Sequence, residues 1–370
     1  WKMALSIGIV GLPNVGKSTL FNSLSKSAHA EAANYPFCTI EPNSAVVPVP
    51  DRRIDALCDI VKPQRALNTT VEFTDIAGLV KGASKGEGLG NQFLSHIRET
   101  SAIVHVVRCF EDDNVVHVEG SVDPVRDCEV ISTELLLADI QTVEKRIERL
   151  EKQSRQDKKL QPMLEFTKQI LNHLNAGNPA ISFDGRNEDI YEQFSKEIKL
   201  ITDKKVIFAA NVDEDSLANG NSYVDALKEY AIKTGNDHVI MVCAKIEEEL
   251  ISMEEDERIE YLESLGVSAE SGLDKIIRVG YDTLGLISYF TAGVKEVRAW
   301  TIENGWKAPR AASVIHNDFE RGFIRAEVIS YDDFIEYKGE AGAKAAGKMR
   351  TEGKEYRVAD GDIMHFLFNI

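Results

Sequence analysis

The sequence predicts an α/β protein built around a doubly wound parallel sheet, and three observations support this. Short apolar runs alternate with stretches of helical periodicity, which is the pattern of repeated strand–helix–strand units. The first apolar run, residues 5–10, leads directly into a glycine-rich turn and a helical stretch. The chain has 370 residues and 43% hydrophobic content, which suffices for two or three domains with their own cores.

Five apolar runs fit buried strands of this sheet. They are residues 5–10, 71–74, 103–107, 206–210 and 239–242. A helix is expected over residues 17–26, directly after the glycine-rich turn. Asp75 follows the second run and Asn211 follows the fourth. Because ligands bind at the carboxyl ends of strands in such sheets, we expect both side chains near a ligand site.

A long excursion separates the third and fourth strands. Residues 132–150 and 160–174 repeat apolar side chains at helical spacing, which predicts an inserted pair of antiparallel helices. The stretch is longer than a normal crossover connection. The alternative is that these are ordinary surface helices of the core domain.

The pattern changes again from about Leu286. Residues 297–301 and 323–328 alternate like half-buried strands, and a turn at residues 360–362 precedes a closing strand at 364–368. These features predict a small α+β module at the carboxyl end.

Charge and composition narrow the class of partner. The formal net charge of −17 disfavours DNA and other non-specific nucleic-acid binding, since phosphates are repelled. Residues 246–274 hold eleven acids and one base, whereas residues 141–173 hold eight bases and five acids, so a local patch can still meet RNA. No apolar run is long enough for a membrane span and no cleavable signal is visible. Five scattered cysteines without a CxxC pair indicate reduced thiols, and we expect a cytoplasmic location.

The glycine-rich turn carries the strongest motif. Residues 11–18 fit G-x-x-x-x-G-K-[ST] between a strand and a helix, which is the context that confirms a phosphate-binding P-loop. Gly11 and Gly16 allow close backbone approach, and the helix N-terminus attracts phosphate. Lys17 supplies a charge for the β- and γ-phosphates, and Ser18 a hydroxyl for Mg²⁺. The expected nucleotide contacts here are Asn14, Val15, Gly16, Lys17, Ser18 and Thr19.

Two further segments complete a Mg²⁺–phosphate site. Asp75 begins a D-x-x-G motif after the second strand, and it offers a carboxylate for Mg²⁺. Gly78 of the same motif offers an N–H group for the γ-phosphate. Thr39 lies in a segment that can order around Mg²⁺ when the γ-phosphate is present, although a solvated loop threonine is the plainer interpretation.

These motifs resemble the Obg branch of translation-factor GTPases. The resemblance rests on residues 11–22 (GLPNVGKSTLFN) and on residues 75–83 (DIAGLVKGA) with the glycines that follow. More narrowly, residues 34–43 (NYPFCTIEPN), 105–112 (HVVRCFED) and 290–300 (FTAGVKEVRAW) are similar to the YchF/Obg-like ATPase subfamily.

The resemblance implies a domain plan and a partner. It implies a G domain in two parts (residues 3–131 and 200–284), an inserted coiled coil (residues 132–199) and a ubiquitin-like TGS domain (residues 285–370). It also implies that the protein associates with the ribosome.

The base-reading slot departs from the usual GTPase pattern. GTPases read guanine with N-K-x-D, but here the slot is Asn211-Val212-Asp213-Glu214. A glutamate cannot occupy the aspartate's bidentate position without moving, which weakens guanine selection. The resemblance implies that ATP is accepted, with the base near Asn211 and Val212, and that Cys243-Ala244-Lys245 is the last base-contacting loop. A shifted guanine pose that uses Asp213 is the alternative.

Hydrolysis is expected to be slow. Leu79 stands where Ras-like enzymes place a glutamine that orients water, and it has no polar group. Lys17 and Gly78 remain to stabilise the transferred phosphate. His117 is a candidate catalytic group, its plainer interpretation being a solvated loop histidine. Asn14 is a candidate ligand for K⁺, or else a simple turn former.

The leading hypothesis is a slow, Mg²⁺-dependent ATPase switch that associates with the ribosome and prefers ATP to GTP. One rival is an Obg-type GTPase with relaxed base specificity. Another is a nucleotide-binding scaffold with negligible turnover.

Overall fold

A computed structural model describes residues 5–31, 43–77 and 89–369 of the chain. The chain forms two compact units, and the chain crosses between them several times. The first unit comprises residues 1–27, 40–45 and 72–276, and the second comprises residues 28–39, 46–71 and 277–370.

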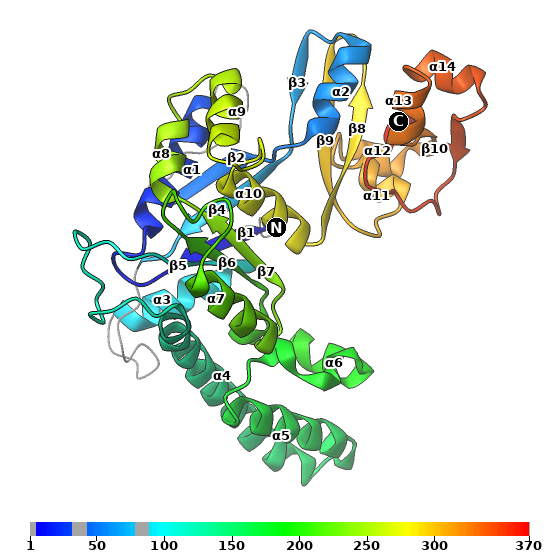
Figure 1. The fold of residues 1–370 in the computed structure, drawn as a ribbon. Helices are drawn as coiled ribbons and strands as arrows, with labels where there is room; N and C mark the ends of the chain where they lie inside the picture. The colour runs from blue at the N-terminus through cyan, green and yellow to red at the C-terminus, as the bar shows by residue number, and fades with distance from the viewer. Residues whose placement is uncertain (1–4, 32–42, 78–88, 370) are drawn as a thin grey trace. The chain divides into compact units, whose positions relative to one another are not determined.

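The first unit is built on a six-stranded sheet with the order β2-β4-β1-β5-β6-β7 (Figure 1). The five predicted strands are confirmed. They are β1 (Ser6–Val10), β4 (Thr70–Asp75), β5 (Ala102–Arg108), β6 (Val206–Asn211) and β7 (His238–Val242). The pairs β1–β4, β1–β5, β5–β6 and β6–β7 are all parallel, as a doubly wound sheet requires. The sequence prediction missed the edge strand β2 (Ser44–Pro48).

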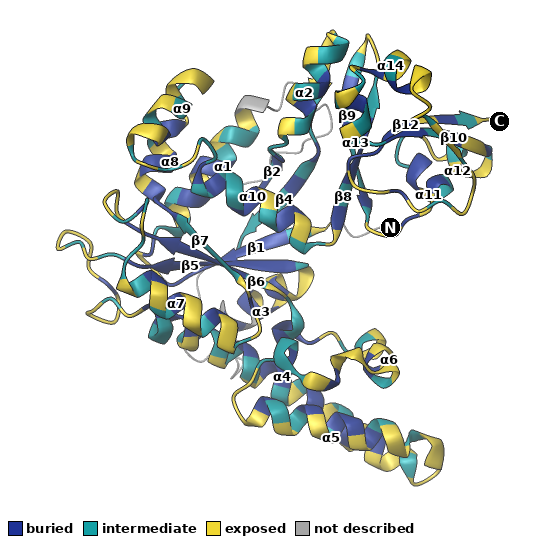
Figure 2. Ribbon diagram, turned by 45° about the vertical axis from the view of Figure 1, so that its right-hand side comes forward, coloured by how far each residue is buried: buried dark blue, intermediate teal, exposed yellow. Residues whose placement is uncertain are grey.

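Helices cover both faces of this sheet, and β5 is therefore buried along its whole length (Figure 2). The helices of the unit are α1 (Lys17–Glu31), α3 (Leu89–Glu99), α4 (Pro124–Ser154), α5 (Gln161–Asn175), α6 (Asp189–Glu197), α7 (Ser222–Lys233), α8 (Ala244–Leu250), α9 (Glu255–Ser264) and the start of α10 (Gly272–Thr283). Within the described ranges, no helix is long and apolar enough to cross a membrane.

The predicted helical insertion is present, and its first helix begins earlier than expected. Asp123 caps α4 by accepting from the N–H of Arg126, and Pro124 opens the helix, a position where its missing N–H costs nothing. The first half of α4 packs on β5 and α7, and the helix then pairs with α5. The predicted apolar positions Val143, Ile147 and Leu150 do form this helix–helix core.

The insertion is more than a pair of helices. The helix α6 and the 3-10 turns around it add aromatic residues to the same core, with Phe166 in edge contacts with Phe183, Tyr191 and Phe194. Asp139 of α4 binds the segment at residues 201 and 202, where the chain returns from the insertion to the sheet. Its carboxylate accepts from the N–H groups of Ile201 and Thr202 at 2.9 and 2.8 Å and from the Thr202 hydroxyl at 2.6 Å.

The second unit contains another six-stranded sheet, with the order β11-β10-β12-β8-β9-β3. The predicted carboxyl-terminal strands are confirmed as β9 (Glu296–Glu303), β10 (Phe323–Ile329) and β12 (Ile363–Phe368). They are joined by β8 (Leu286–Ala292) and β11 (Arg350–Glu352). The short helices are α11 (Ala308–Ala312), α12 (Asp318–Arg321), α13 (Tyr331–Glu336) and α14 (Glu340–Ala345).

An early segment of the chain completes this second sheet. The strand β3 (Arg65–Leu67) pairs in parallel with β9, and α2 (Arg52–Val61) buries Ile54 and Leu57 in the same core as Phe290 and Val297. Residues 52–67 therefore pack with the second unit, although β2 and β4 on either side of them belong to the first sheet, and the domain plan drawn from the sequence placed these residues in the G domain. The identification of this unit as a TGS domain stays a prediction.

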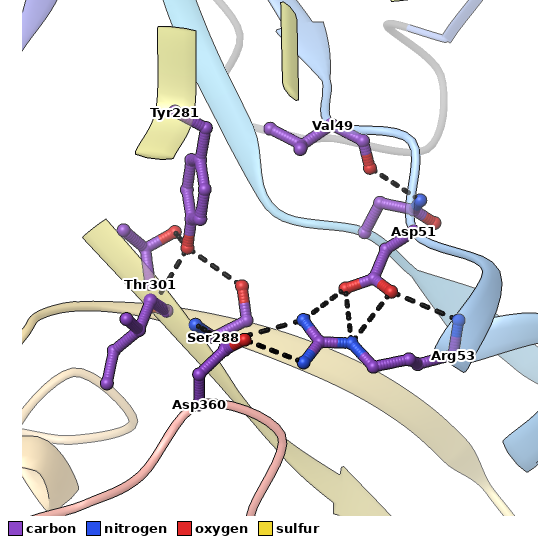
Figure 3. A network of polar contacts seen from close by, with 9 residues as sticks. Val49, Asp51, Arg53, Tyr281, Ser288, Thr301 and Asp360 are labelled. Carbon is purple, nitrogen blue, oxygen red and sulfur yellow. Dashed lines mark hydrogen bonds and ion pairs between the residues drawn. The ribbon is translucent and has the colours of Figure 1, made fainter. Parts of the chain in front are cut away.

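A polar network ties this early segment to the carboxyl-terminal part of the chain (Figure 3). The Arg53 guanidinium bridges Asp51 and Asp360, with distances of 2.9 Å to one oxygen of each carboxylate. Asp360 also accepts from the Ser288 N–H at 3.0 Å. The two carboxylates raise the pKa of Arg53 further above its ordinary value against the opposing effect of burial, so the guanidinium stays charged.

Candidate functional site

The P-loop connects β1 to α1, and its backbone requires small residues at two points. Gly16 has φ +97°, and a Cβ there would lie 2.3 Å from Nδ2 of Asn211. A Cβ on Gly11 would meet the Val106 carbonyl oxygen and the Val15 side chain, each at 3.0 Å. Asn14 has φ 63°, a left-handed conformation that asparagine tolerates well. The loop therefore presents its backbone N–H groups closely packed, as a phosphate cradle needs.

Lys17 and Asp75 meet beside this loop. Asp75 pairs with Ile9 across the β1–β4 ladder, so its carboxylate projects at the edge where the P-loop begins. The Lys17 ammonium forms an ion pair with that carboxylate and donates to the carbonyl of Ile76 at 3.2 Å. Both side chains are mostly buried, at 12% and 23% exposed. The cation expected to bind phosphate and the carboxylate expected to bind Mg²⁺ are thus in direct contact.

The oxygen donors here fit Mg²⁺, which prefers hard oxygen ligands and keeps several waters. Ser18 is exposed at the start of α1, and its hydroxyl makes no hydrogen bond to another described residue. It offers a hydroxyl at the same edge as the Asp75 carboxylate. A Mg²⁺ ion would be held by this pair and would neutralise phosphate charge. Thr39, Gly78 and Leu79 lie outside the described residues. The other expected contacts in the loop, Val15 and Thr19, are buried and half-buried.

The Asn211 side chain connects the P-loop to the loop at residues 243–245. Its Nδ2 donates to the Val15 carbonyl at 2.8 Å, and its Oδ1 accepts from the Ala244 N–H at 3.0 Å. The side chain is 4% exposed, so both bonds are shielded from water. Asn211 is therefore a positioning residue in this arrangement, and its amide is already engaged by protein groups on both sides.

The other residues of the base-reading slot differ in burial. Val212 is 1% exposed and its side chain packs in a cluster with Leu217 and Val224, so the base contact expected there stays a prediction that would fall to its backbone. Asp213 and Glu214 are exposed. The Asp213 carboxylate accepts from the N–H of Ser216 at 3.0 Å and keeps its second oxygen for other partners.

The loop of Cys243, Ala244 and Lys245 begins α8 next to Asn211. Cys243 is buried, which raises the pKa of its thiol, while N–H groups of Ile246 and Lys245 bond to its sulfur. Ala244 contributes its N–H to Asn211. Lys245 is exposed and is the one member whose side chain is free to cover a base.

The loop after β5 contacts the P-loop, and sequence reasoning missed the residue that shapes it. Arg108 is 2% exposed, and its guanidinium donates to the carbonyls of Phe110, Val115 and Asp112 at 3.1, 2.7 and 3.2 Å. Asn14 in turn donates to the Val116 carbonyl at 3.3 Å. In the sequence, Arg108 ended an apolar strand, and an arginine in that place could have been recognised as a loop organiser.

His117 lies in this loop but is buried, at 5% exposed, and both ring nitrogens are engaged. Its Nε2 lies 2.6 Å from the Asp127 carboxylate, and its Nδ1 accepts from the Glu119 N–H at 3.0 Å. This pattern requires the proton on Nε2. Burial raises the pKa of Asp127, and bonds from His117 and Arg126 oppose that rise. In this arrangement His117 anchors the loop, so contact with an attacking water requires it to leave Asp127.

Two family models match the chain. One described as a 50S ribosome-binding GTPase matches residues 6–212, more than half of the sequence. One for the carboxyl-terminal domain of YchF GTPases, described as a protein of unknown function, matches residues 286–369.

Whole-chain relatives agree with these models. The chain is 57% identical over 369 residues to the "Ribosome-binding ATPase YchF" of Pasteurella multocida and 54% identical over 371 residues to that of Bacillus subtilis, with both chains fully covered each time. The solved Schizosaccharomyces pombe YchF GTPase is 42% identical, with a TM-score of 0.88 over 99% of this chain and 98% of that one. The names of these relatives differ in the nucleotide, since the bacterial proteins are called ATPases and the yeast protein a GTPase. The P-loop, the Lys17–Asp75 pair and these full-length matches together show that the chain belongs to the YchF family of P-loop nucleoside triphosphate hydrolases.

Proposed function

We propose that the protein is a Mg²⁺-dependent ATPase that works as a slow nucleotide-controlled switch on the ribosome. The observation that carries the preference for ATP is the slot at residues 211–214. Guanine selection needs a carboxylate that pairs with two N–H donors of the base, together with a side chain that covers the ring. Asn211 uses one amide hydrogen on Val15 and one oxygen lone pair on Ala244, the Val212 side chain is in the core, and Glu214 is exposed and one carbon longer than aspartate.

Because Val212 is buried, position 214 is the better place for a substitution that tests this slot. Lysine at position 212 would place an ammonium group among Leu217 and Val224 and would damage the fold, so it makes a poor test. Glu214→Asp changes only an exposed carboxylate. It should shift the ratio of ATP to GTP affinity toward GTP if the slot reads the base, with Asp215→Glu as an exposed neighbouring control. An unchanged ratio would mean that the base is read elsewhere.

A GTPase with relaxed base specificity is the second candidate. One observation favours it, because the exposed Asp213 in the slot has one carboxylate oxygen that makes no hydrogen bond to another described residue. Asp213→Asn should weaken GTP binding more than ATP binding under this second candidate. It should affect the two nucleotides alike under the first.

Slow turnover follows from the lack of a free polar side chain at the two positions considered for orienting water. Leu79 cannot orient water, and His117 is held by Asp127 and the Glu119 N–H. Catalysis through His117 therefore requires breaking a buried hydrogen bond first, and a partner that moves the loop would raise the rate. Phosphate release measured over many turnovers, with and without ribosomes, tests this. A fast basal rate that ribosomes do not change would contradict the switch.

Two ion requirements belong to the same proposal. Mg²⁺ would be bound through Ser18, Asp75 and Thr39, and Gly78 would contribute an N–H to the γ-phosphate. K⁺ would be bound near Asn14, whose Oδ1 accepts no hydrogen bond from another described residue while its Nδ2 donates to the Val116 carbonyl. Turnover should then rise when K⁺ replaces Na⁺, and Asn14→Ala should lose that response. Equal rates in the two salts would remove the K⁺ site.

The helical insertion offers a ribosome-facing surface. Arg149, Lys152 and Arg155 are exposed near the end of α4 and form no ion pair with another described residue. By contrast, Arg146 is paired with Glu197, and Lys168 with Glu151. Unpaired cations on an acidic protein can contact RNA phosphates while the remainder suppresses indiscriminate binding. Such a function places the protein in the cytoplasm, where its thiols would stay reduced.

Charge reversal tests this surface. Replacing Arg149, Lys152 and Arg155 with glutamate should weaken co-sedimentation with ribosomes and leave ATP binding unchanged. Reversing the already paired Lys168 is the matched control, and it should have a smaller effect. Added salt should weaken the wild-type association, since released counterions favour dissociation. Co-sedimentation that ignores both salt and the triple substitution would leave the insertion without this role.

A further inference from the structure

A cavity of about 80 Å³ lies inside the first unit, between the sheet and the root of the helical insertion. Its floor is the face of β5 and β6 that carries Ile103, His105 and Phe208. Its walls come from α4, from α7 and from the turns that return the chain after α5. Among the wall residues are Cys128, Ile131, Leu135, Pro179, Ile201 and Tyr230. The cavity is mostly apolar and belongs to neither the P-loop nor the base-reading slot.

His105 is the unusual member of this lining. It sits in the middle of β5, opposite Val10 on one side and Phe208 on the other, and it is 5% exposed. Strand alternation places it on the same face as Ile103, toward the cavity. Its ring nitrogens make no hydrogen bond to another described residue, although its ring lies 5.7 Å from that of Phe208. The ring nitrogens are not among the fully covered side-chain atoms without a partner, so they face the space of the cavity, where a ligand or water can bond to them.

Other polar groups around the cavity are already satisfied. The Tyr230 hydroxyl donates to Ser132 at 3.2 Å, and the Asn236 amide oxygen accepts from the Val206 N–H at 3.0 Å. Lys204 donates to the Arg98 carbonyl at 3.1 Å. Burial lowers the pKa of His105 to about 4, so the ring is neutral at pH 7 and offers one N–H donor and one acceptor. The lining therefore offers an apolar space with one free hydrogen-bonding ring.

We propose that this cavity binds a small uncharged molecule of the short-chain alcohol class, with its apolar body against Ile131 and Leu135 and its hydroxyl group on the His105 ring. The size sets the class, because an engineered apolar cavity of about 150 Å³ holds benzene, and about 80 Å³ leaves room for about three to five heavy atoms. A cationic ligand is excluded, since the lining contains the Lys204 ammonium and, among the described residues, no carboxylate.

A ligand in this cavity would contact residues next to the P-loop and residues at the base of the helical insertion. Val10, in the lining, directly precedes the P-loop glycine Gly11. Thr202, also in the lining, is held by Asp139 at the point where the insertion returns to the sheet. A ligand that binds only the folded arrangement stabilises it by mass action.

Titration of the full-length protein with 1-butanol tests the site, with butylammonium as a charged control of the same length. NMR signals of the His105 ring should shift and saturate, with Kd of about 1–10 mM for so small a ligand, and butylammonium should have no effect. His105→Phe keeps an aromatic ring and removes the hydrogen bond, so affinity should fall about fivefold to tenfold. Leu135→Phe fills the space and should abolish saturable binding.

Three results would overturn the assignment. One is no saturable shift of the His105 ring in the wild-type protein, which needs no variant to be folded. Another is equal affinity for His105→Phe and wild type, since the ring would then contribute no hydrogen bond. The third is a crystal grown with 1-butanol that shows only ordered water on His105, because the polar group would then be satisfied without an organic ligand.

Discussion

Replacing Glu247 with glutamine should change how stability depends on pH. Glu247 lies on α8 and is 5% exposed, and its carboxylate accepts from the Leu273 N–H at 3.2 Å. Burial is the main cause that raises its pKa from 4.5 to about 7, with a further rise from the nearby Asp274 carboxylate. Hydrogen bonds from Leu273 and Ser271, and the charge of Arg258, oppose the rise.

The sign of the effect follows from proton binding. In the unfolded chain Glu247 ionises near 4.5, and in the folded protein near 7. Between these values the folded state binds more protons, so the free energy of unfolding falls as pH rises through that window. The difference between the two pKa values corresponds to about 3 kcal/mol at about 1.36 kcal/mol per unit. This penalty is nearly absent below the lower value and complete above the higher one.

Urea unfolding followed by far-UV circular dichroism measures the effect. Glu247→Gln should gain about 2–3 kcal/mol relative to wild type between about pH 5 and about pH 8.5. Any cost of the amide itself is independent of pH and cancels in this comparison. Glu248→Gln, an exposed neighbour on the same helix, should show no such gain. Parallel pH profiles for Glu247→Gln and wild type would refute the reasoning.

Three other substitutions test separate parts of the structure. Asp139→Ala leaves three buried donors without an acceptor, and the free energy of unfolding in urea should fall by about 3–5 kcal/mol. A fall of less than about 1 kcal/mol would contradict the role of Asp139 in holding residues 201 and 202. Asn211→Ala removes the side chain that joins the P-loop to the Ala244 N–H, and the affinities for ATP and GTP should both fall by about tenfold or more in calorimetry. A loss of affinity for only one of the two nucleotides would instead show that Asn211 reads the base. Asp360→Asn should destabilise the second unit by about 1–3 kcal/mol, read from tryptophan fluorescence of Trp300 and Trp306, whereas the exposed Asp332→Asn should not.

Much of the first unit could be predicted because its signals are local. Apolar runs marked β1, β4, β5, β6 and β7, and the glycine spacing located the P-loop. The same reasoning placed Lys17 and Asp75 at one edge, and the structure brings them together. A strand such as β5, buried on both faces, needs no partner information to be recognised.

Long-range pairings could not be predicted. The strand β3 has only three residues, and nothing in them indicates pairing with β9 more than two hundred residues later. The contacts that Asn211 makes with Val15 and Ala244 could not be predicted for a similar reason, because both partners lie on other segments, and its contact with the base stays a prediction. His117 looked like a loop residue, and only the structure joins it to Asp127.

The central claim is that this slot favours ATP, and direct titration tests it. Calorimetry of the full-length protein with non-hydrolysable ATP and GTP analogues in Mg²⁺ buffer compares the two affinities under one condition. With Val212 in the core and Glu214 in place of the aspartate reader, the ATP analogue should bind about tenfold or more tightly than the GTP analogue. Equal affinities, or tighter binding of the GTP analogue, would contradict the account.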